Sequence, residues 1–587
     1  MAQFIKFVFA SCLGVIIASM VIVFGGIGMI SALASQGEAP EQVSDNSVLT
    51  IDFDNTIPEK TNNLEMDPFD FANDRILGVH DIIKSIEYAK TDDRIKGIFI
   101  EADGIPAGFT TATAVRDALI DFKTSGKFIV AYSDYYTQGA YYMVSVADEI
   151  YVNPLGMVDF RGFAAQVPFF KDMLDRLGIT MQVSYAGKFK SATEPYRRNN
   201  MSEESKLQLR EYLDELYGVM LNEISEVRGV SVAELRKIAD SYAANDPEVA
   251  VKYDLIDAVG HRDDALQDIR DRMGIEEDKS INTISLEGYS QSVNSKKSGS
   301  DRIAVVYAEG TIVDGKGESG SVGSDRYTKI INKIRKDDNI KAVVLRINSP
   351  GGSAMASENI WRELSRLRET GKPVIASMGD YAASGGYYIA CIADSIYAEP
   401  TTLTGSIGVF NIIPSAQKML AEKAGIRFDT VKTGRFATGI SPFFDLSEEE
   451  KQIIQKRTDQ TYNLFLSRVA DGRKMEKEKV HEIAQGRVWT GTKASTIGLV
   501  DKIGDLDAAV AAAARMAGTD SYRISEYPET KEPIQQFLER FLDEEEPYSK
   551  VLLRKQLGNW YPFYRHIEEI QNSNGMQTRL PFVLQFN

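Results

Sequence analysis

Cysteine and histidine are scarce in this chain of 587 residues. Of its two cysteines, Cys12 lies in an apolar N-terminal stretch and Cys391 in the second half. Two cysteines so placed exclude a disulfide framework and a thiolate metal cluster. The four histidines are scattered without the spacing of metal ligands: His80, His261, His481 and His566. They offer little material for a metal site or a Ser-His-Asp triad, so we expect neither metal nor cofactor.

The sequence also lacks any concentration of positive charge. It carries 67 lysine and arginine residues against 84 acidic residues, a formal net charge of −17, without a run of basic residues. Because a phosphate backbone is bound by a basic surface, this balance argues against a nucleic-acid partner. Apolar residues make up 43% of the chain, which is enough to bury large cores. The length predicts several domains, or one duplicated unit with extensions.

A long uncharged segment stands near the N-terminus. Residues 7–32 read FVFASCLGVIIASMVIVFGGIGMISA, enough to cross a hydrocarbon core of roughly 30 Å as a helix. The apolar region of a cleavable signal peptide is shorter, at about 7–15 residues, although the ALAS at 32–35 resembles a cleavage site. We therefore expect residues 1–36 to form a transmembrane anchor. Lys6 precedes the span and Glu38 follows it, which favours a cytoplasmic N-terminus and a body on the opposite side.

Stretches of the first half recur in the second at an offset near 245 residues. The clearest pair is DDRIKGIFIEAD at 92–103 and DDNIKAVVLRIN at 337–348. A second pair is MSEESKLQLREYLDELY at 201–217 and LSEEEKQIIQKRTDQTY at 446–462. A single period of this length indicates tandem duplication of one domain. The predicted divisions are an anchor at 1–36, an N-terminal repeat at 37–290, a linker rich in Ser, Lys and Gly at 291–301, a C-terminal repeat at 302–525 and a tail at 526–587.

Short β-rich runs alternate with amphipathic segments in each repeat. KAVVLRI at 341–347 and KPVIASM at 372–378 are strand-like, and the segment between them places Ile360, Leu364 and Leu367 on one helical face. Strand, helix and strand at this spacing predict parallel β-α-β units, so the expected fold class is α/β in both repeats. Ser447 and Glu450 form the capping-box pattern that opens a long helix.

The two repeats differ at the centre of an otherwise similar motif. Residues 380–388 read DYAASGGYY and residues 134–142 read DYYTQGAYY, so that Ser384 aligns with Gln138. Small neighbours would leave the Ser384 hydroxyl open to a substrate, as a nucleophile requires. A serine at the start of a helix is also a typical N-cap, and the difference between the repeats does not decide between these roles.

An adjacent glycine pair is likewise confined to the C-terminal repeat. INSPGGS at 347–353 follows a strand and precedes a helix, whereas the N-terminal repeat has ADGIPAG at 102–108. Adjacent glycines there can turn backbone amides toward a developing oxyanion, or can simply form a tight turn.

A serine hydroxyl needs a base, and lysine is the remaining candidate because no histidine accompanies either motif. AGKFKSATEPY at 186–196 aligns with TGRFATGISPF at 433–443. Lys188 then has a basic counterpart in Arg435, while Lys190 aligns with Ala437. One repeat keeps a lysine and the other a serine, so a complete dyad requires both repeats. Desolvation would lower the pKa of such a lysine toward neutrality.

These motifs resemble the signal peptide peptidase A family, also called protease IV, in its long, duplicated bacterial form. The likeness covers nearly the whole chain and includes SPGGS, SGGYY, TGSIGVF and the second lysine of GKFKSATEP. SPGG alone would also suit Clp-type proteases and crotonases. The resemblance implies a Clp/crotonase-like fold with a Ser-Lys dyad. It makes Ser384 the nucleophile, Lys190 the general base and Ser406 the residue that orients the lysine. The oxyanion-hole amides would be those of Gly352 and Gly385, with Gly351 as an alternative to Gly352.

The resemblance also implies an activity and an assembly. The family degrades signal peptides left in the membrane after preprotein processing, and its long form is a tetramer. This chain is therefore expected to be a serine endopeptidase of the bacterial inner membrane, with its body in the periplasm and apolar peptides as substrates. Two other functions stay open, a crotonase-type acyl-CoA enzyme and a non-catalytic membrane scaffold of the same fold. The expected anchor argues against the first, and the division of lysine and serine between the repeats argues against the second.

Overall fold

A computed structural model describes most of the two repeats. It covers residues 42–53, 55–63, 75–277, 279–293, 300–318, 320–529 and 575–580, with the isolated residues 14, 18, 553, 556 and 557. The expected anchor therefore lies outside the described residues except at two positions, as does most of the expected tail. Within the described part of the chain, no helix has the length and apolar character needed to cross a membrane.

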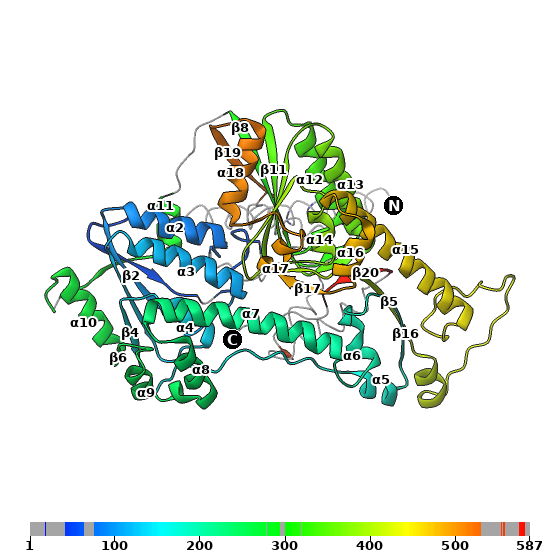
Figure 1. Cartoon of the computed structure of the whole chain (residues 1–587), viewed down its shortest axis with the longest axis horizontal. Helices are drawn as coiled ribbons and strands as arrows, with labels where there is room; N and C mark the ends of the chain where they lie inside the picture. Colours follow the sequence, from blue (N-terminus) through cyan, green and yellow to red (C-terminus); the bar gives the residue numbers. More distant parts are fainter. Residues whose placement is uncertain are drawn as a thin grey trace.

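A parallel six-stranded sheet forms the centre of the N-terminal repeat, at the left of Figure 1. Its strand order is β6-β4-β3-β2-β1-β7. The bounds of these strands are β1 Ser47–Ile51, β2 Ile95–Glu101, β3 Phe128–Ser133, β4 Glu149–Val152, β6 Ala258–Val259 and β7 Asn282–Ser285. The inner strands are almost fully buried because helices pack on both faces of the sheet, as is typical of parallel sheets.

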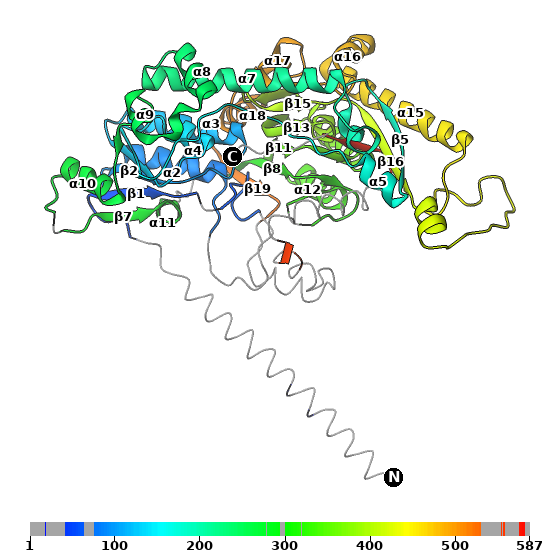
Figure 2. The same cartoon turned by 90° about the horizontal axis from the view of Figure 1, so that it is seen from below.

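The helices of the N-terminal repeat connect and cover these strands. They are α2 Val79–Thr91, α3 Phe109–Lys123, α4 Gln138–Val144, α5 Lys171–Leu177, α6 Glu194–Arg197, α7 Glu203–Arg228, α8 Val232–Ser241, α9 Pro247–Lys252, α10 Arg262–Met273 and α11 Leu286–Ser292, with 3₁₀ turns η1 Ser191–Thr193 and η2 Ala243–Asn245. The longest, α7, runs from this repeat toward the other one (Figures 1 and 2). The Ser202 side chain accepts a hydrogen bond that caps its start, and Gly229 ends it in a left-handed conformation.

The C-terminal repeat has the same architecture, with an eight-stranded sheet at its centre. Its main order is β17-β15-β13-β11-β8-β19, with β14 and β18 branching from β13, and every pairing is parallel except that of β15 with β17. The bounds are β8 Asp301–Glu309, β11 Ile340–Ser349, β13 Val374–Ala383, β14 Ser395–Ala398, β15 Leu403–Gly405, β17 Val488–Thr490, β18 Lys502–Ile503 and β19 Tyr522–Tyr527. The α/β class and the duplication predicted from the sequence are confirmed.

The helices of the C-terminal repeat follow the same order. They are α12 Ser324–Lys336, α13 Ala354–Arg368, α14 Gly385–Ala390, α15 Glu448–Arg473, α16 Lys477–Ile483, α17 Gly491–Thr496 and α18 Leu506–Ala517, with a π-helical turn η3 Met419–Lys423. The face predicted for α13 is confirmed, since Ile360, Leu364 and Leu367 are all buried. The capping box of Ser447 and Glu450 is confirmed at the start of α15.

A third sheet combines strands of both repeats and a strand of the C-terminal tail. Its order is β10-β9-β12-β20-β16-β5. The bounds are β5 Thr180–Ala186, β9 Ile312–Val313, β10 Val322–Gly323, β12 Gly351–Ser353, β16 Val409–Ser415 and β20 Gln577–Arg579. The antiparallel pairing of β5 with β16 runs over seven residue pairs and connects the two repeats directly.

Buried polar contacts also connect the repeats. The Arg346 guanidinium donates to the Glu59 carboxylate at 2.7 Å and to the Ser377 hydroxyl at 3.0 Å. The Asp380 carboxylate accepts hydrogen bonds from the amide and the hydroxyl of Thr111, at 3.0 and 2.7 Å. Burial raises the pKa of Asp380, because desolvation disfavours its charged form. Since both carboxylates are almost fully buried, the fold depends on their partners across the repeat boundary.

The first prediction concerns the buried Arg346–Glu59 pair. Glu59→Gln should leave the guanidinium without its carboxylate and lower stability on the order of 3–5 kcal/mol, the range for breaking a buried pair. The double variant Glu59→Gln/Arg346→Met should lose less, because no unpaired charge remains. Guanidinium denaturation followed by circular dichroism measures both. Lys206→Gln, in an exposed pair with Glu203, is the control and should change little. A Glu59→Gln midpoint equal to that control would contradict the prediction.

Candidate active site

The side chains of Ser384, Lys190 and Ser406 meet at the boundary of the two repeats. The Lys190 Nζ lies 2.7 Å from the Ser384 Oγ, 3.0 Å from the Ser406 Oγ and 3.1 Å from the Ser406 carbonyl oxygen. All three residues are at most 1% exposed. The lysine comes from the N-terminal repeat and both serines from the C-terminal repeat, so this contact forms within one chain.

The local backbone of Ser384 is strained in a way that turns its side chain out of the helix. It lies between β13 and α14 with φ +57°, in the left-handed region that a residue with a Cβ rarely adopts. Its amide donates to the Gly405 carbonyl at 2.8 Å, which holds this conformation. Although Ser384 occupies the N-cap position of α14, its side chain makes no capping hydrogen bond. The hydroxyl therefore serves the contact with Lys190 instead of the helix end.

Lys190 is held by the loop between β5 and η1, and this loop packs tightly against the C-terminal repeat. The Phe189 amide donates to the Gln485 carbonyl at 2.9 Å. Gly486 adopts φ +78°, and a Cβ there would lie 2.6 Å from the Lys190 Cβ. Any side chain at position 486 would therefore displace the lysine.

A buried glutamine on α7 ties the lysine loop to β17. The Gln208 side chain donates to the Phe189 carbonyl at 3.0 Å and to the Ser191 hydroxyl at 3.2 Å, and it accepts from the Val488 amide at 3.3 Å. Sequence reasoning missed both Gln208 and Gly486. The only sequence signal for Gln208 was a polar residue at a buried position of a helix.

Burial controls the protonation of Lys190. Desolvation lowers its pKa well below the ordinary value of a lysine, because the ammonium form loses its hydration inside the protein. The neutral amine is the form that can accept a proton from a hydroxyl. The site therefore places an amine that can accept a proton next to the Ser384 hydroxyl.

Ser406 lies between β15 and β16 and is fully buried. It adopts φ +51°, and its amide donates to the Arg487 carbonyl at 2.7 Å. Its hydroxyl and its carbonyl both lie within hydrogen-bond distance of the Lys190 Nζ. Two contacts from one rigid residue fix the direction of the amine.

The candidate oxyanion glycines lie beside the serine. Gly351 and Gly352 begin the short strand β12, after β11 and shortly before α13, so the pair follows a strand and precedes a helix as the sequence predicted. Gly351 adopts φ +96°, and a Cβ on it would lie 2.6 Å from the Gly385 amide nitrogen. Its own amide donates to the Ser349 hydroxyl at 3.2 Å, which leaves Gly352 as the better candidate donor.

The equivalent position of the N-terminal repeat is filled by Gln138. Its side-chain oxygen accepts from the amides of Arg161 and Gly162 at 3.1 and 2.7 Å, and its amide nitrogen donates to the Gly162 carbonyl at 3.3 Å. The residue is 3% exposed. The side chain thus closes with protein contacts the space that corresponds to the serine site.

Lys188 and Arg435, the two basic residues that align between the repeats, lie outside the site. The Lys188 side chain is exposed and lies over the Phe189 ring, with its Nζ 5.2 Å from the ring centroid. Arg435 is 74% exposed in its side chain and pairs with Glu449. The structure therefore brings Lys190, and not Lys188, to the serine.

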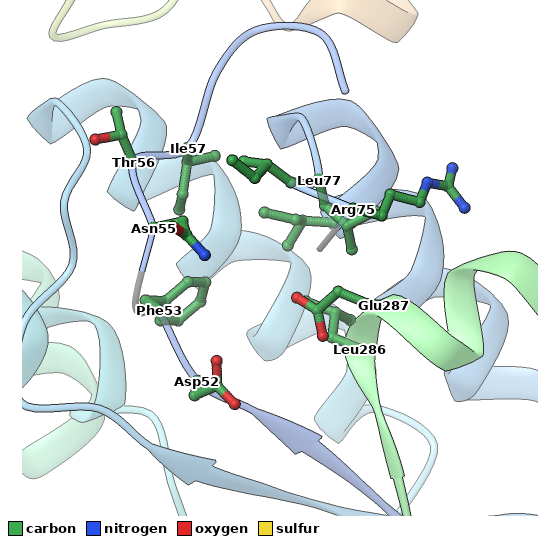
Figure 3. A pocket seen from close by; sticks show the side chains of 11 residues that line it. Asp52, Phe53, Asn55, Thr56, Ile57, Arg75, Leu77, Leu286 and Glu287 are labelled. Carbon is green, nitrogen blue, oxygen red and sulfur yellow. The ribbon is translucent and has the colours of Figure 1, made fainter. Parts of the chain in front are cut away.

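A pocket in the N-terminal repeat is separate from this site (Figure 3). It is lined by residues 52, 53, 55–57, 75–77, 82, 286 and 287, none of which belongs to the lysine–serine contact. Within the described ranges, the acidic, histidine and cysteine side chains form no group of three or more that could hold a metal ion.

Comparison with known families agrees with the duplicated architecture. The model of peptidase family S49 matches residues 121–276 and again residues 366–520, once in each repeat. Protease 4 of Haemophilus influenzae is 34% identical over 524 residues, which cover 86% of this chain and 83% of that protein. Protease 4 of Salmonella typhi is 35% identical over 522 residues, or 86% and 84% of the two chains.

A plant relative shows the same similarity. The chloroplastic serine protease SPPA of Arabidopsis thaliana is 34% identical over 452 residues, which cover 75% of this chain and 66% of that protein. Fold, site and relatives together define a serine peptidase. The chain belongs to peptidase family S49, and its predicted kinship with signal peptide peptidase A is confirmed.

The second prediction follows from the lowered pKa of Lys190. The rate at which Ser384 reacts with a fluorophosphonate should rise with pH as the amine loses its proton. The midpoint should lie well below the value near 10.4 of an exposed lysine. Quenched labelling measured from pH 5 to 10 gives this curve, and Lys188→Ala is the control that should keep it. A labelling rate that is independent of pH over this range would argue against a lysine base.

Proposed function

We propose that this peptidase is a membrane-anchored serine endopeptidase with Ser384 as its nucleophile and Lys190 as its general base. The distance of 2.7 Å between the Lys190 Nζ and the Ser384 Oγ carries this proposal. A nucleophile and its base must lie within hydrogen-bond reach, and the base must be in its neutral form. Burial of the lysine supports the second requirement.

Acylation would begin with attack of the Ser384 Oγ on the carbonyl carbon of a peptide bond. The hydroxyl proton passes to the Lys190 Nζ, and the carbonyl oxygen becomes an oxyanion. Collapse of the tetrahedral intermediate breaks the C–N bond, and the lysine returns the proton to the leaving amine. In deacylation, water attacks the carbonyl carbon of the Ser384 ester with Lys190 as base. This step releases the carboxylic acid product and restores the Ser384 hydroxyl.

The contacts around Lys190 support this direction of proton transfer. A neutral amine has two N–H bonds and one lone pair. The Ser406 carbonyl can only accept a hydrogen bond, so one N–H is directed to it, at 3.1 Å. The Ser406 hydroxyl can accept the second, at 3.0 Å. The lone pair is then free to receive the Ser384 proton, and Ser406 acts as the residue that orients the lysine.

The oxyanion would be stabilised by backbone amides. Gly385 follows the nucleophile at the start of α14, and Gly352 lies on β12, the strand whose Gly351 approaches Gly385. Fixed amides of this kind stabilise developing charge without reorganisation. Both positions of β12 require glycine, because a Cβ on Gly351 would lie 2.6 Å from the Gly385 amide nitrogen and a Cβ on Gly352 would lie 1.9 Å from the Ile312 carbonyl oxygen.

Substrate, assembly and location follow the resemblance to signal peptide peptidase A. The proposed substrates are signal peptides left in the membrane and other apolar peptides. The proposed assembly is a homotetramer in the bacterial inner membrane, held by residues 1–36 with its body on the periplasmic side. The Protease 4 relatives are bacterial, which supports a bacterial protease of this kind.

The third prediction tests the dyad with matched variants. Ser384→Ala and Lys190→Ala should each lower peptide hydrolysis by several orders of magnitude, because either change removes one half of the proton-transfer pair. Lys188→Ala should keep most of the activity, since its side chain is exposed and away from the serine. Single-turnover kinetics on purified protein, with circular dichroism to verify folding, measures the effect. Equal losses in Lys188→Ala and Lys190→Ala would overturn the assignment of the base.

The fourth prediction separates the anchor from the chemistry. Deleting residues 1–36 should give a soluble protein that hydrolyses short peptides at the rate of the full chain, because every proposed catalytic residue lies far downstream. Hydrolysis of apolar peptides embedded in vesicles should be markedly slower, since the tether no longer raises their effective concentration. Both substrates are assayed on both proteins. Loss of short-peptide hydrolysis in a folded truncated protein would make the N-terminal segment part of the site.

A further inference from the structure

A buried glutamine on α7 contacts the lysine loop on both sides of Lys190. The Gln208 Nε2 donates to the Phe189 carbonyl at 3.0 Å and to the Ser191 hydroxyl at 3.2 Å, and the residue is 2% exposed. These two acceptors belong to the residues that directly precede and follow the lysine. A primary amide has two N–H bonds, and both are used here. The glutamine therefore restrains the loop at the two positions next to the candidate base.

The oxygen of the same amide contacts strand β17. The Gln208 Oε1 accepts from the Val488 amide at 3.3 Å. Because the Phe189 carbonyl can only accept and the Val488 amide can only donate, this orientation of the glutamine amide is the one that satisfies both. One side chain thus joins a loop of the N-terminal repeat to a strand of the C-terminal repeat.

Strand β17 supports the backbone of both serines of the candidate site. Val488 lies opposite Gly405 in the antiparallel pairing of β17 with β15. The Gly405 carbonyl accepts from the Ser384 amide at 2.8 Å, and the Arg487 carbonyl accepts from the Ser406 amide at 2.7 Å. The strand that the glutamine contacts therefore also helps to determine where the two serines lie.

Two further residues of α7 hold the helix against β17. Glu211 forms an ion pair with Arg487, and the Thr490 hydroxyl donates to the Glu215 carboxylate. At three and seven positions after Gln208, these acidic residues lie on the same face of the helix as the glutamine. Since α7 runs from one repeat toward the other (Figure 1), this face keeps the glutamine at the boundary of the repeats.

Comparison of the two repeats associates the glutamine with the lysine. In the pairing of residues 201–217 with residues 446–462, Gln208 aligns with Ile453. Ile453 lies on α15 and is 44% exposed, so its side chain can replace neither the burial nor the hydrogen bonds of the glutamine. The glutamine is present in the repeat that carries Lys190 and absent from the matched position of the other repeat.

We infer that Gln208 is a positioning residue for Lys190, which holds the amine at the distance from Ser384 and Ser406 that proton transfer requires. This inference rests on the proposed function. None of the glutamine's hydrogen bonds is to the lysine itself, so it acts through the residues on either side and through β17. Because a small misplacement of a reacting group can cost a large factor in rate, kcat depends on this residue more than KM does.

The same contacts keep the lysine loop closed around the amine. The hydrogen bonds of the Lys190 Nζ are to Ser384 and Ser406, and neither partner is charged. Glu211 and Arg487, the charged groups beside the glutamine contact, are paired with each other. Desolvation is thus the cause that lowers the pKa of Lys190. Water admitted by an opened loop would favour the ammonium form and raise that pKa.

The test compares Gln208→Met with a matched control, Gln138→Met. Gln138 is also a buried glutamine with three hydrogen bonds to the main chain, at the position of the N-terminal repeat that corresponds to the serine. Gln208→Met should lower kcat for short peptides about tenfold or more, with little change in KM. The pH midpoint of fluorophosphonate labelling should rise by about one unit or more, toward the value of an exposed lysine. Gln138→Met should keep both values.

A purely structural role of Gln208 predicts a different result. Both variants would then lower the midpoint of guanidinium denaturation, while their folded molecules keep the kcat and the labelling midpoint of the original chain. That result, or equal kinetic changes in Gln208→Met and Gln138→Met, overturns the inference. Circular dichroism under the assay conditions verifies that the molecules measured are folded.

Ser191→Ala tests the inference if Gln208→Met does not fold. This change removes one contact of the lysine loop and leaves those of Gln208 with Phe189 and Val488 in place. The labelling midpoint should rise in the same direction and by less. An unchanged midpoint in Ser191→Ala overturns the inference.

Lys190→Ala, assayed beside these variants, separates the inference from the proposed function. Full activity of Lys190→Ala would refute the lysine base, and the inference with it. If Lys190→Ala is inactive and Gln208→Met keeps the original kcat and labelling midpoint, the proposed function stands and the inference alone is refuted. Loss of activity in Lys190→Ala together with the raised midpoint in Gln208→Met supports both.

Discussion

The antiparallel pairing of β5 with β16 is the contact on which the candidate site depends. Lys190 follows the end of β5 by four residues, and Ser406 precedes the start of β16 by three. Seven residue pairs fix the register of these strands, so they also fix where the amine stands relative to both serines. A shift of one residue would turn the neighbouring side chains to the opposite face of the sheet. The distances at the site are thus set by backbone pairing between repeats.

The rest of the interface keeps water away from that amine. Gln208 and the 485–486 turn enclose the lysine loop, and Arg346 and Asp380 form buried hydrogen bonds across the same boundary. A buried ammonium would be costly without a carboxylate, and the contacts of Lys190 are a carbonyl and two hydroxyls. The enclosure therefore favours the neutral amine. In this way a fold with few histidines contains a group that can act as a base.

Comparison of the two repeats explains how far the sequence could predict the site. Ser384 against Gln138 and Lys190 against Ala437 are differences that a duplicated chain displays without any structure. The α/β class followed from period and spacing. The glycine pair was predicted to follow a strand and precede a helix, and Gly351 and Gly352 do lie between β11 and α13.

Other residues of the site could not be predicted, because no local sequence pattern marks them. Gln208 acts through hydrogen bonds to residues 189, 191 and 488, so its role depends on three segments meeting in space. The requirement for glycine at position 486 arises from the approach of a distant loop. The segment that contains β20 pairs with residues more than 150 positions away. Contacts of this kind are set by tertiary packing.

The position of Gln138 bears on how the chain behaves at low concentration. Because its side chain closes the corresponding position of the N-terminal repeat, serine and lysine meet at one place in the described part of the chain, and both come from the same polypeptide. The contact between the two groups therefore forms when the chain folds, and it does not depend on the concentration of subunits. Dilution that separates an assembly of such chains leaves the lysine beside the serine in every one of them.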